Sequence, residues 1–322
     1  MLNYPVKFSP ILKEKIWGGN KLVAMLHKDS TSNTLGESWE ISAVDNNISV
    51  VENGNLKGKN LSELLKTYTS ELIGKNNYSI YGAKFPLLIK FIDAKQDLSI
   101  QVHPNDELSK KRHNSFGKTE MWYIMQADTD ARLILGFKEH LSSGQYVKLL
   151  EEDNIMSVLK EVNVKSGDAF FIEPGTVHAI GASVVLAEIQ QTSDITYRIY
   201  DFDRIDGDGN KRELHTEFAK DALNFNTNIG TERAYSKELN TLSEVVNCSY
   251  FKTNIIPVIG EIELDYSQLD SFVIFMCVEG NAKISIFGNR ESLKMGETVL
   301  IPALAEKVKI ISKNCKLLEI TI

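Results

Sequence analysis

Four side chains in this sequence have the types and surroundings that metal chemistry requires: Gln101, His103, Glu120 and His178. From Leu98 to His103 apolar residues alternate with polar ones, so a β-strand would place Gln101 and His103 on the same face. Glu120 follows a Gly-Lys-Thr segment, and His178 ends a Pro-Gly-Thr-Val-His segment. Two imidazole nitrogens and two oxygen donors suit zinc better than calcium and leave room for a water or substrate oxygen. We therefore expect these side chains to hold one Zn²⁺ ion per chain.

Charged side chains gather around these segments in a protein whose formal net charge is −7. Lys90 interrupts an apolar run, and Lys118 and Arg198 adjoin the segments that carry the expected ligands. Glu188 and Asp194 lie between the last of these ligands and Arg198. Such a mixture suits a substrate with a phosphate at one end and exchangeable protons near the metal at the other.

Each of these residues also has an ordinary structural interpretation. Lys90 could be an edge-strand lysine that reaches solvent, and Arg198 could form a cross-strand ion pair with Asp194 or Asp201. Trp17, beside two glycines, could line the mouth of a ligand site or pack against the end of a barrel. The remaining histidines fall in polar loops or at a helix start, where we expect them to be solvent-exposed or capping: His27, His113, His140 and His215.

Short strands separated by turns must position the candidate residues. The alternation and the β-branched runs predict strands at 37–42, 85–93, 98–103, 120–126, 131–137, 162–172, 182–189 and 196–202. Helical spacing predicts helices at 60–74, within 142–160 and at 213–226, and the polar stretch from 104 to 118 is expected to be a loop. Regular short strands with turn signals indicate barrels or jelly rolls rather than a parallel α/β sheet.

The chain contains an internal repeat. Residues 120–137 align without gaps on 271–288, and residues 166–174 correspond to 295–302. This alignment puts Ser271 at the position of Glu120 and Lys307 at that of His178, so the second copy lacks the expected ligands. The polar stretch 227–241 marks the boundary, and we expect a metal-binding domain over 1–235 and a smaller β-domain over 236–322.

Composition and charge narrow the class of protein. The 322 residues are 43% hydrophobic and 25% charged, as in ordinary globular proteins. The negative charge argues against nucleic-acid or membrane partners, and no apolar run is long enough for a membrane helix. The N-terminus lacks the features of a signal peptide, and three widely spaced cysteines fit a reducing compartment. We therefore expect a cytoplasmic protein; nothing in the sequence indicates its oligomeric state.

Several motifs together resemble one known family. They are Trp17-Gly18-Gly19, Glu37-Ser38-Trp39-Glu40, Lys90, the segment Leu98-Ser-Ile-Gln-Val-His-Pro104, Lys118-Thr119-Glu120-Met121-Trp122, the segment Pro174-Gly-Thr-Val-His-Ala-Ile180, and Ser193-Asp194 through Tyr197-Arg198. The set is similar to the type I mannose-6-phosphate isomerases (phosphomannose isomerases) in their short bacterial form. The chain lacks room for the large helical insertion of longer members, and one residue is missing between Pro174 and Gly175; neither departure touches an expected ligand.

The resemblance implies a mainly β chain with two cupin-type jelly-roll barrels and a few inserted helices. It also implies zinc at Gln101, His103, Glu120 and His178, an active-site arginine at Arg198, and interconversion of mannose 6-phosphate and fructose 6-phosphate. The partner would be a hexose phosphate.

Such a reaction moves a proton between C1 and C2 of the sugar. Lys90, Glu188 and Asp194 are alternative candidates for the base, and Arg198 would stabilise the developing charge. Ser99, Lys118 and Trp17 are expected to contact substrate, with Lys90 as a further candidate for the phosphate and hydroxyl groups.

Two other functions compete with this interpretation. An iron-dependent dioxygenase would normally have three histidines or a histidine-carboxylate triad, and Gln101 argues against it. The other is a non-enzymatic sugar-binding cupin.

Overall fold

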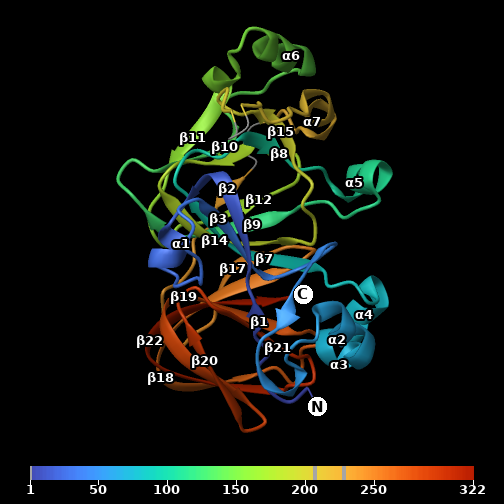
Figure 1. Cartoon of the computed structure of the whole chain (residues 1–322), viewed down its shortest axis with the longest axis vertical. Coiled ribbons are helices and arrows are strands. Elements are labelled where there is room, and N and C mark those ends of the chain that lie inside the picture. The colour runs from blue at the N-terminus through green and yellow to red at the C-terminus, as the bar shows by residue number, and fades with distance from the viewer. Residues whose placement is uncertain (1, 206–208, 227–229) are drawn as a thin grey trace.

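Residues 2–205, 209–226 and 230–322 are described in the computed structural model of the chain. They form a mainly β structure, as predicted, with two units stacked along the longest axis (Figure 1). The N-terminal unit contains two large sheets, and the C-terminal unit, built from strands between 243 and 321, contains a third large sheet. In the described part of the chain, no helix is long and apolar enough to cross a membrane.

The larger sheet of the N-terminal unit has the order β16-β12-β9-β14-β7-β2-β3. Its strands are β2 (Ile11–Gly19), β3 (Leu35–Ile41), β7 (Leu87–Ala94), β9 (Glu120–Ala127), β12 (Ala169–Ile172), β14 (Val184–Gln191) and β16 (Thr231–Glu232). Every residue of β7 is buried because one sheet face packs towards the C-terminal unit and the other towards the second sheet. This double burial explains the nearly continuous apolar run.

The second sheet has the order β11-β10-β13-β8-β15. Its strands are β8 (Ile100–Val102), β10 (Arg132–Phe137), β11 (Leu159–Asn163), β13 (His178–Ile180) and β15 (Tyr197–Tyr200). An apolar cluster that includes Trp17 and Trp122 fills part of the space between the two sheets. The candidate site occupies the polar remainder of this space.

The C-terminal sheet has the order β17-β18-β22-β19-β20, with β21 paired to β19. Its strands are β17 (Ser243–Asn247), β18 (Lys252–Asp265), β19 (Val273–Ile286), β20 (Asn289–Lys294), β21 (Thr298–Ile301) and β22 (Lys307–Thr321). Bulges interrupt the long strands, and alternate residues face different cores: Ile255 packs towards the N-terminal unit and Ile256 into a separate C-terminal cluster. Two short pairs complete the strands, β1 (Phe8–Ser9) with β6 (Val50–Val51) and β4 (Ala43–Val44) with β5 (Asn47–Ile48).

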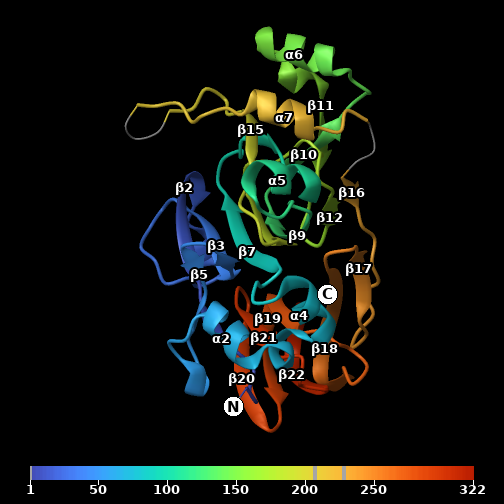
Figure 2. The same ribbon diagram turned by 90° about the vertical axis from the view of Figure 1, so that its right-hand side faces the viewer.

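Short helices lie at the periphery (Figure 2). They are α1 (Lys21–Ala24), α2 (Leu61–Tyr68), α3 (Ser70–Ile73), α4 (Lys75–Tyr81), α5 (Asp106–His113), α6 (Ser143–Glu151) and α7 (Thr216–Ala222), with 3₁₀ turns at Gly54–Leu56 and Ile155–Val158. The helix predicted at 60–74 is confirmed in part: Asn60 and Glu63 form a capping box at its start, but Thr69, at positive φ, divides it into α2 and α3. The loop predicted from 104 to 118 is wrong in part: Asn105 caps the helix α5 by accepting from the Leu108 backbone N–H.

The internal repeat is displaced by two residues from the gapless alignment. Glu120 pairs with Ile172 in the first copy, and the equivalent pair in the second copy is Val273 with Ile301. Val273, not Ser271, therefore occupies the position of Glu120. A gapless comparison misses the shift because bulges add residues to single strands. A valine side chain offers no donor atom to a metal.

The boundary between the two units follows the last helix. Residues 227–229 of the predicted boundary stretch lie outside the described residues, and β16 within that stretch pairs with β12 of the N-terminal unit. The chain then enters the C-terminal sheet at β17.

Candidate metal centre

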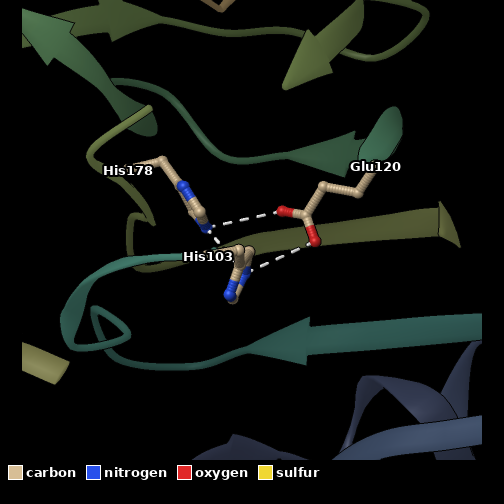
Figure 3. A group of neighbouring side chains, drawn as sticks. All are labelled: His103, Glu120 and His178. Atoms are coloured by element: carbon tan, nitrogen blue, oxygen red, sulfur yellow. Dashed lines mark hydrogen bonds and ion pairs between the residues drawn. The ribbon is translucent and has the colours of Figure 1, made fainter. Parts of the chain in front are cut away.

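The expected ligands come from both sheets of the N-terminal unit. Gln101 lies in β8, His103 follows this strand, and His178 opens β13. Gln101 and His178 are directly paired across β8 and β13, so their side chains share a face of the sheet. Glu120 opens β9 in the opposite sheet and reaches across the gap to the histidines (Figure 3).

The two histidines and the glutamate form a compact, buried group. The Nε2 atoms of His103 and His178 lie 3.2 Å apart. Glu120 Oε2 lies 3.6 Å from Nε2 of His103, and Oε1 lies 3.4 Å from Nε2 of His178. All three side chains are at most 1% exposed. Three donor atoms therefore converge on one small volume that water barely reaches.

Backbone carbonyls orient both imidazole rings. Nδ1 of His103 lies 3.0 Å from the Ile195 carbonyl oxygen, and Nδ1 of His178 lies 2.8 Å from that of Thr176. Because a carbonyl only accepts, each Nδ1 carries the proton and each neutral Nε2 presents a lone pair towards Glu120. This is the arrangement in which proteins hold metal-ligating histidines.

The chemistry of this group fits a divalent cation. Oε1 of Glu120 has no hydrogen-bond donor among the described residues, and Oε2 is contacted by the Lys118 ammonium. Burial raises the pKa of Glu120 to about 7 and lowers the pKa of His178 to about 4. Burial and the nearby Lys118 ammonium together lower the pKa of His103 well below its usual value. Neutral imidazoles beside a buried carboxylate with one oxygen free of donors are ready ligands, and a divalent cation would satisfy that oxygen.

Lys118 places an ammonium group against this cluster. Its Nζ lies 2.9 Å from Nε2 of His103 and 3.0 Å from Oε2 of Glu120. The lysine is buried and lies two residues before Glu120, in the segment that leads into β9. Its positive charge therefore contacts two of the atoms that would bind a metal.

A cavity of about 430 Å³ opens beside the cluster. Its lining includes Gln101 and every other residue predicted for catalysis or substrate contact: Trp17, Lys90, Ser99, Lys118, Glu188, Asp194 and Arg198. The space is large enough for a small phosphorylated ligand. The fold thus brings residues from five segments of the chain to one cavity.

Lys90 and Glu188 form a buried ion pair on the wall of this cavity. They are cross-strand neighbours in β7 and β14, and Lys90 Nζ lies 2.8 Å from Oε1 of Glu188 and 2.7 Å from Oε1 of Gln190. Trp122 Nε1 donates to the other oxygen of Glu188 at 3.0 Å. Burial alone would raise the pKa of Glu188, but the ammonium groups of Lys90 and Lys118 lower it to about 2. The interpretation of Lys90 as an edge-strand lysine that reaches solvent is therefore wrong.

Arg198 lies directly across from Gln101 in the neighbouring strand β15. Its Nη1 donates to the Glu213 carbonyl oxygen at 2.6 Å, while its Nε is buried without a partner among the described residues. Asp201 is bound instead by the guanidinium groups of Arg204 and Arg212. The alternative interpretation of Arg198, as an ion pair with Asp194 or Asp201, is therefore wrong, and no described carboxylate lies within ion-pair distance of Arg198.

The cavity wall also contains residues that sequence reasoning missed. β2 contributes Lys13 and Lys15, and β3 contributes Glu37 and Trp39. The ammonium groups of Lys13 and Lys90 both lie over the Trp39 ring. Lys13, Lys15 and Trp17 alternate along β2, so strand periodicity could have placed them together. Trp17 itself is buried in the inter-sheet cluster and also lines the cavity.

The remaining histidines lie outside this centre. His27, His113 and His140 are exposed, as expected, although Nε2 of His113 contacts the Tyr197 hydroxyl at 2.7 Å. His215 precedes α7, and its Nδ1 accepts from the Arg198 backbone N–H at 3.1 Å.

Comparisons with known sequences find two matching family models. The model of the phosphomannose isomerase type I catalytic domain matches residues 6–130, and that of the mannose-6-phosphate isomerase cupin domain matches residues 241–322. The chain is 36% identical over 309 residues to mannose-6-phosphate isomerase ManA of Bacillus subtilis, covering 94% of each protein. It is 34% identical over 299 residues to mannose-6-phosphate isomerase of Streptococcus mutans, covering 92% of each.

Solved structures agree with these sequence relationships. The crystal structure of mannose 6-phosphate isomerase from Bacillus subtilis matches with a TM-score of 0.90 and 33% identity over 99% of both chains. A putative mannosephosphate isomerase from Archaeoglobus fulgidus shares the fold, with a TM-score of 0.79 at 22% identity over 99% of this chain and 97% of the other.

Proposed function

The chain belongs to the type I mannose-6-phosphate isomerase (phosphomannose isomerase) family, and from this premise we propose that it interconverts mannose 6-phosphate and fructose 6-phosphate. The observation that carries the proposal is the buried group of His103, Glu120 and His178 beside a cavity lined with charged side chains. The isomerisation needs an electrophile near one sugar oxygen and a base near the C1 and C2 protons. The cavity supplies candidates for both.

One Zn²⁺ ion would be held by four side chains: Gln101, His103, Glu120 and His178. The two imidazoles, with their Nδ1 atoms fixed by carbonyls, and the buried carboxylate, whose Oε1 has no donor among the described residues, support this set. Gln101 joins it because it is paired with His178 and lines the cavity. When bound, the ion supplies Lewis-acid polarisation of a sugar oxygen.

Arg198 would stabilise the negative charge that develops when a proton leaves the sugar. Its position opposite Gln101 brings the guanidinium to the cavity, and no described carboxylate competes for it. An unpaired cation in a partly buried position interacts strongly with a new negative charge.

Asp194 is the base that the geometry favours among the three candidates. The ion pair keeps Lys90 protonated, because Glu188 and Glu37 raise its pKa against the effect of burial. Glu188, with a pKa near 2 and both oxygens hydrogen-bonded, is a weak base. Asp194 is exposed and lines the cavity, so its carboxylate can reach a bound sugar.

Ser99, Lys118 and Trp17 would contact the sugar phosphate. Ser99 is two residues before Gln101 and faces the same cavity. Lys118 would turn from the histidine towards substrate when a metal takes its place. Trp17 offers an apolar surface beside these polar groups. The hexose phosphate is the partner that this set of contacts suits.

We place the metal-binding domain at 1–235 and a cupin-like domain without metal ligands at 236–322. Val273 and Lys307 at the positions of Glu120 and His178 support this division, as do the separate C-terminal apolar cluster and its strand pairing. Each unit would be a cupin-type jelly-roll barrel.

A coupled assay that detects fructose 6-phosphate formed from mannose 6-phosphate tests the proposal. We expect turnover with one equivalent of zinc, together with exchange of the C2 proton with solvent. Oxygen uptake by an iron-loaded protein would instead identify a dioxygenase. Binding of hexose phosphates without turnover would identify a sugar-binding protein.

A further inference from the structure

The segment that delivers Lys118 and Glu120 to the centre is held by a single carboxylate. Asp106, in the first turn of α5, accepts from the Gly117 backbone N–H at 2.7 Å and from Gln191 Nε2 at 3.1 Å, both through Oδ1. Gln191 in turn accepts from the Thr119 backbone N–H at 2.8 Å through Oε1. Asp106 thus fixes the backbone on both sides of Lys118, directly at 117 and through Gln191 at 119.

Close backbone contact reinforces this attachment. A Cβ atom on Gly117 would lie 2.6 Å from the backbone carbon of Asn105 and 2.6 Å from the backbone nitrogen of Asp106. Only glycine therefore allows the segment to approach the start of α5. The Lys118 backbone N–H also donates to the Pro104 carbonyl oxygen at 3.1 Å, close to His103 in the chain.

The second oxygen of Asp106 is bound by the other unit of the molecule. Tyr250, in the turn between β17 and β18, donates its hydroxyl to Oδ2 at 2.6 Å. Tyr250 is part-buried and belongs to the region matched by the cupin-domain model. One hydrogen-bonded path therefore runs from the C-terminal unit through Asp106 to residues 117–120.

We propose that Tyr250 and Asp106 are positioning residues through which the C-terminal unit sets the place of Lys118 and Glu120 in the metal centre. The inference rests on the proposed function for the identity of that centre. It gives the second unit, which lacks ligands of its own, a role in the chemistry of the first. Groups that orient ligands typically change metal affinity about 10- to 100-fold when they are removed.

Tyr250→Phe tests the inference because it removes the hydroxyl and keeps the ring. The probes are Zn²⁺ alone, in competition with a chelator, and Co²⁺ alone, whose visible spectrum reports ligand geometry. We expect the metal Kd to rise about tenfold, the Co²⁺ spectrum to change and deuterium exchange at 116–121 to increase. With mannose 6-phosphate, kcat should fall more than KM changes.

Tyr266→Phe is the matched control. Tyr266 donates to Glu319 Oε1 at 2.9 Å, so the variant also loses a tyrosine-carboxylate hydrogen bond, but within the C-terminal unit. Metal affinity and the Co²⁺ spectrum should stay as in the unmodified protein. If both variants lower the melting temperature equally and neither alters the metal site, Tyr250 is only structural and the inference is overturned.

A second variant keeps the test decisive if Tyr250→Phe folds poorly. Asp106→Ala removes both carboxylate oxygens and with them the hydrogen bonds to Gly117, Gln191 and Tyr250. The double variant should weaken metal binding no further than Asp106→Ala alone, because both changes interrupt one path. Additive losses would overturn the inference.

Failure of the proposed function and failure of the inference can be told apart. If the unmodified protein binds no metal, the proposed function fails. Unchanged deuterium exchange at 116–121 in the variants would separately contradict the inference.

Discussion

The Nζ atom of Lys118 lies 2.9 Å from Nε2 of His103, so an ammonium group contacts the nitrogen that would bind zinc. It also lies 3.0 Å from Oε2 of Glu120. A fixed cation and a metal ion compete for the same lone pairs. A metal ion bound as proposed would therefore displace Lys118 and leave it available to substrate.

Lys118→Met should tighten metal binding and reduce turnover. Removing a competing charge-assisted hydrogen bond is worth roughly tenfold or more in the zinc dissociation constant. Turnover should fall because a proposed substrate contact is lost. Zinc titration against a chelator and steady-state kinetics measure the two effects. Lys160→Met, at an exposed lysine outside the cavity, is the control; weaker zinc binding in Lys118→Met would contradict the competition.

Arg198→Ala should lower kcat without removing the metal. A single donor aimed at developing charge contributes about 10²–10³ in rate. Metal analysis and kinetics on the same preparation separate the two quantities. Arg112→Ala removes an arginine that pairs with Asp221 outside the cavity and should leave kcat nearly unchanged. Parallel loss of metal and activity in Arg198→Ala would make it a structural residue.

Glu188→Gln should destabilise the protein in a pH-dependent way. The variant removes the carboxylate that pairs directly with the buried Lys90 and leaves only the more distant charge of Glu37, which costs up to about 3–5 kcal/mol. Because the folded pKa of Glu188 is about 2, below its ordinary value, the ion pair stabilises the fold above about pH 5, and this contribution is lost as the pH falls towards 2.

Urea unfolding of metal-free protein between neutral and acid pH measures this contribution. The difference in unfolding free energy between the unmodified protein and Glu188→Gln should shrink as the pH falls. A difference that stays constant down to about pH 3 would show that Glu188 is not ionised in the folded state.

Much of the metal centre could be predicted because its signals are local. Alternation along 98–103 places Gln101 and His103 on one face, and this follows from strand geometry alone. Glu120 and His178 were found from their segments and from comparison with a repeat that lacks donors at both positions. The mainly β class followed from the regular spacing of strands and turns.

What could not be predicted depends on pairing between distant strands. Lys90 and Glu188 meet because β7 and β14 lie in one particular register, which no local pattern contains. An ion pair with Asp194 or Asp201 was the structural alternative for Arg198, but the loop after β15 brings Arg204 and Arg212 to Asp201 instead. Strand pairing also shows that Val273, two residues after Ser271, occupies the position of Glu120 in the second copy. A gapless comparison of the sequence cannot reveal this shift, because it does not detect bulges.

Isomerase activity before and after metal removal tests the central claim most directly. The protein is stripped with a chelator, assayed for conversion of mannose 6-phosphate to fructose 6-phosphate, and assayed again as zinc is added back. If Gln101, His103, Glu120 and His178 hold a catalytic zinc ion, activity disappears with the metal and returns in full at about one zinc ion per chain. Undiminished activity in protein shown by metal analysis to be free of zinc and other metals would contradict it.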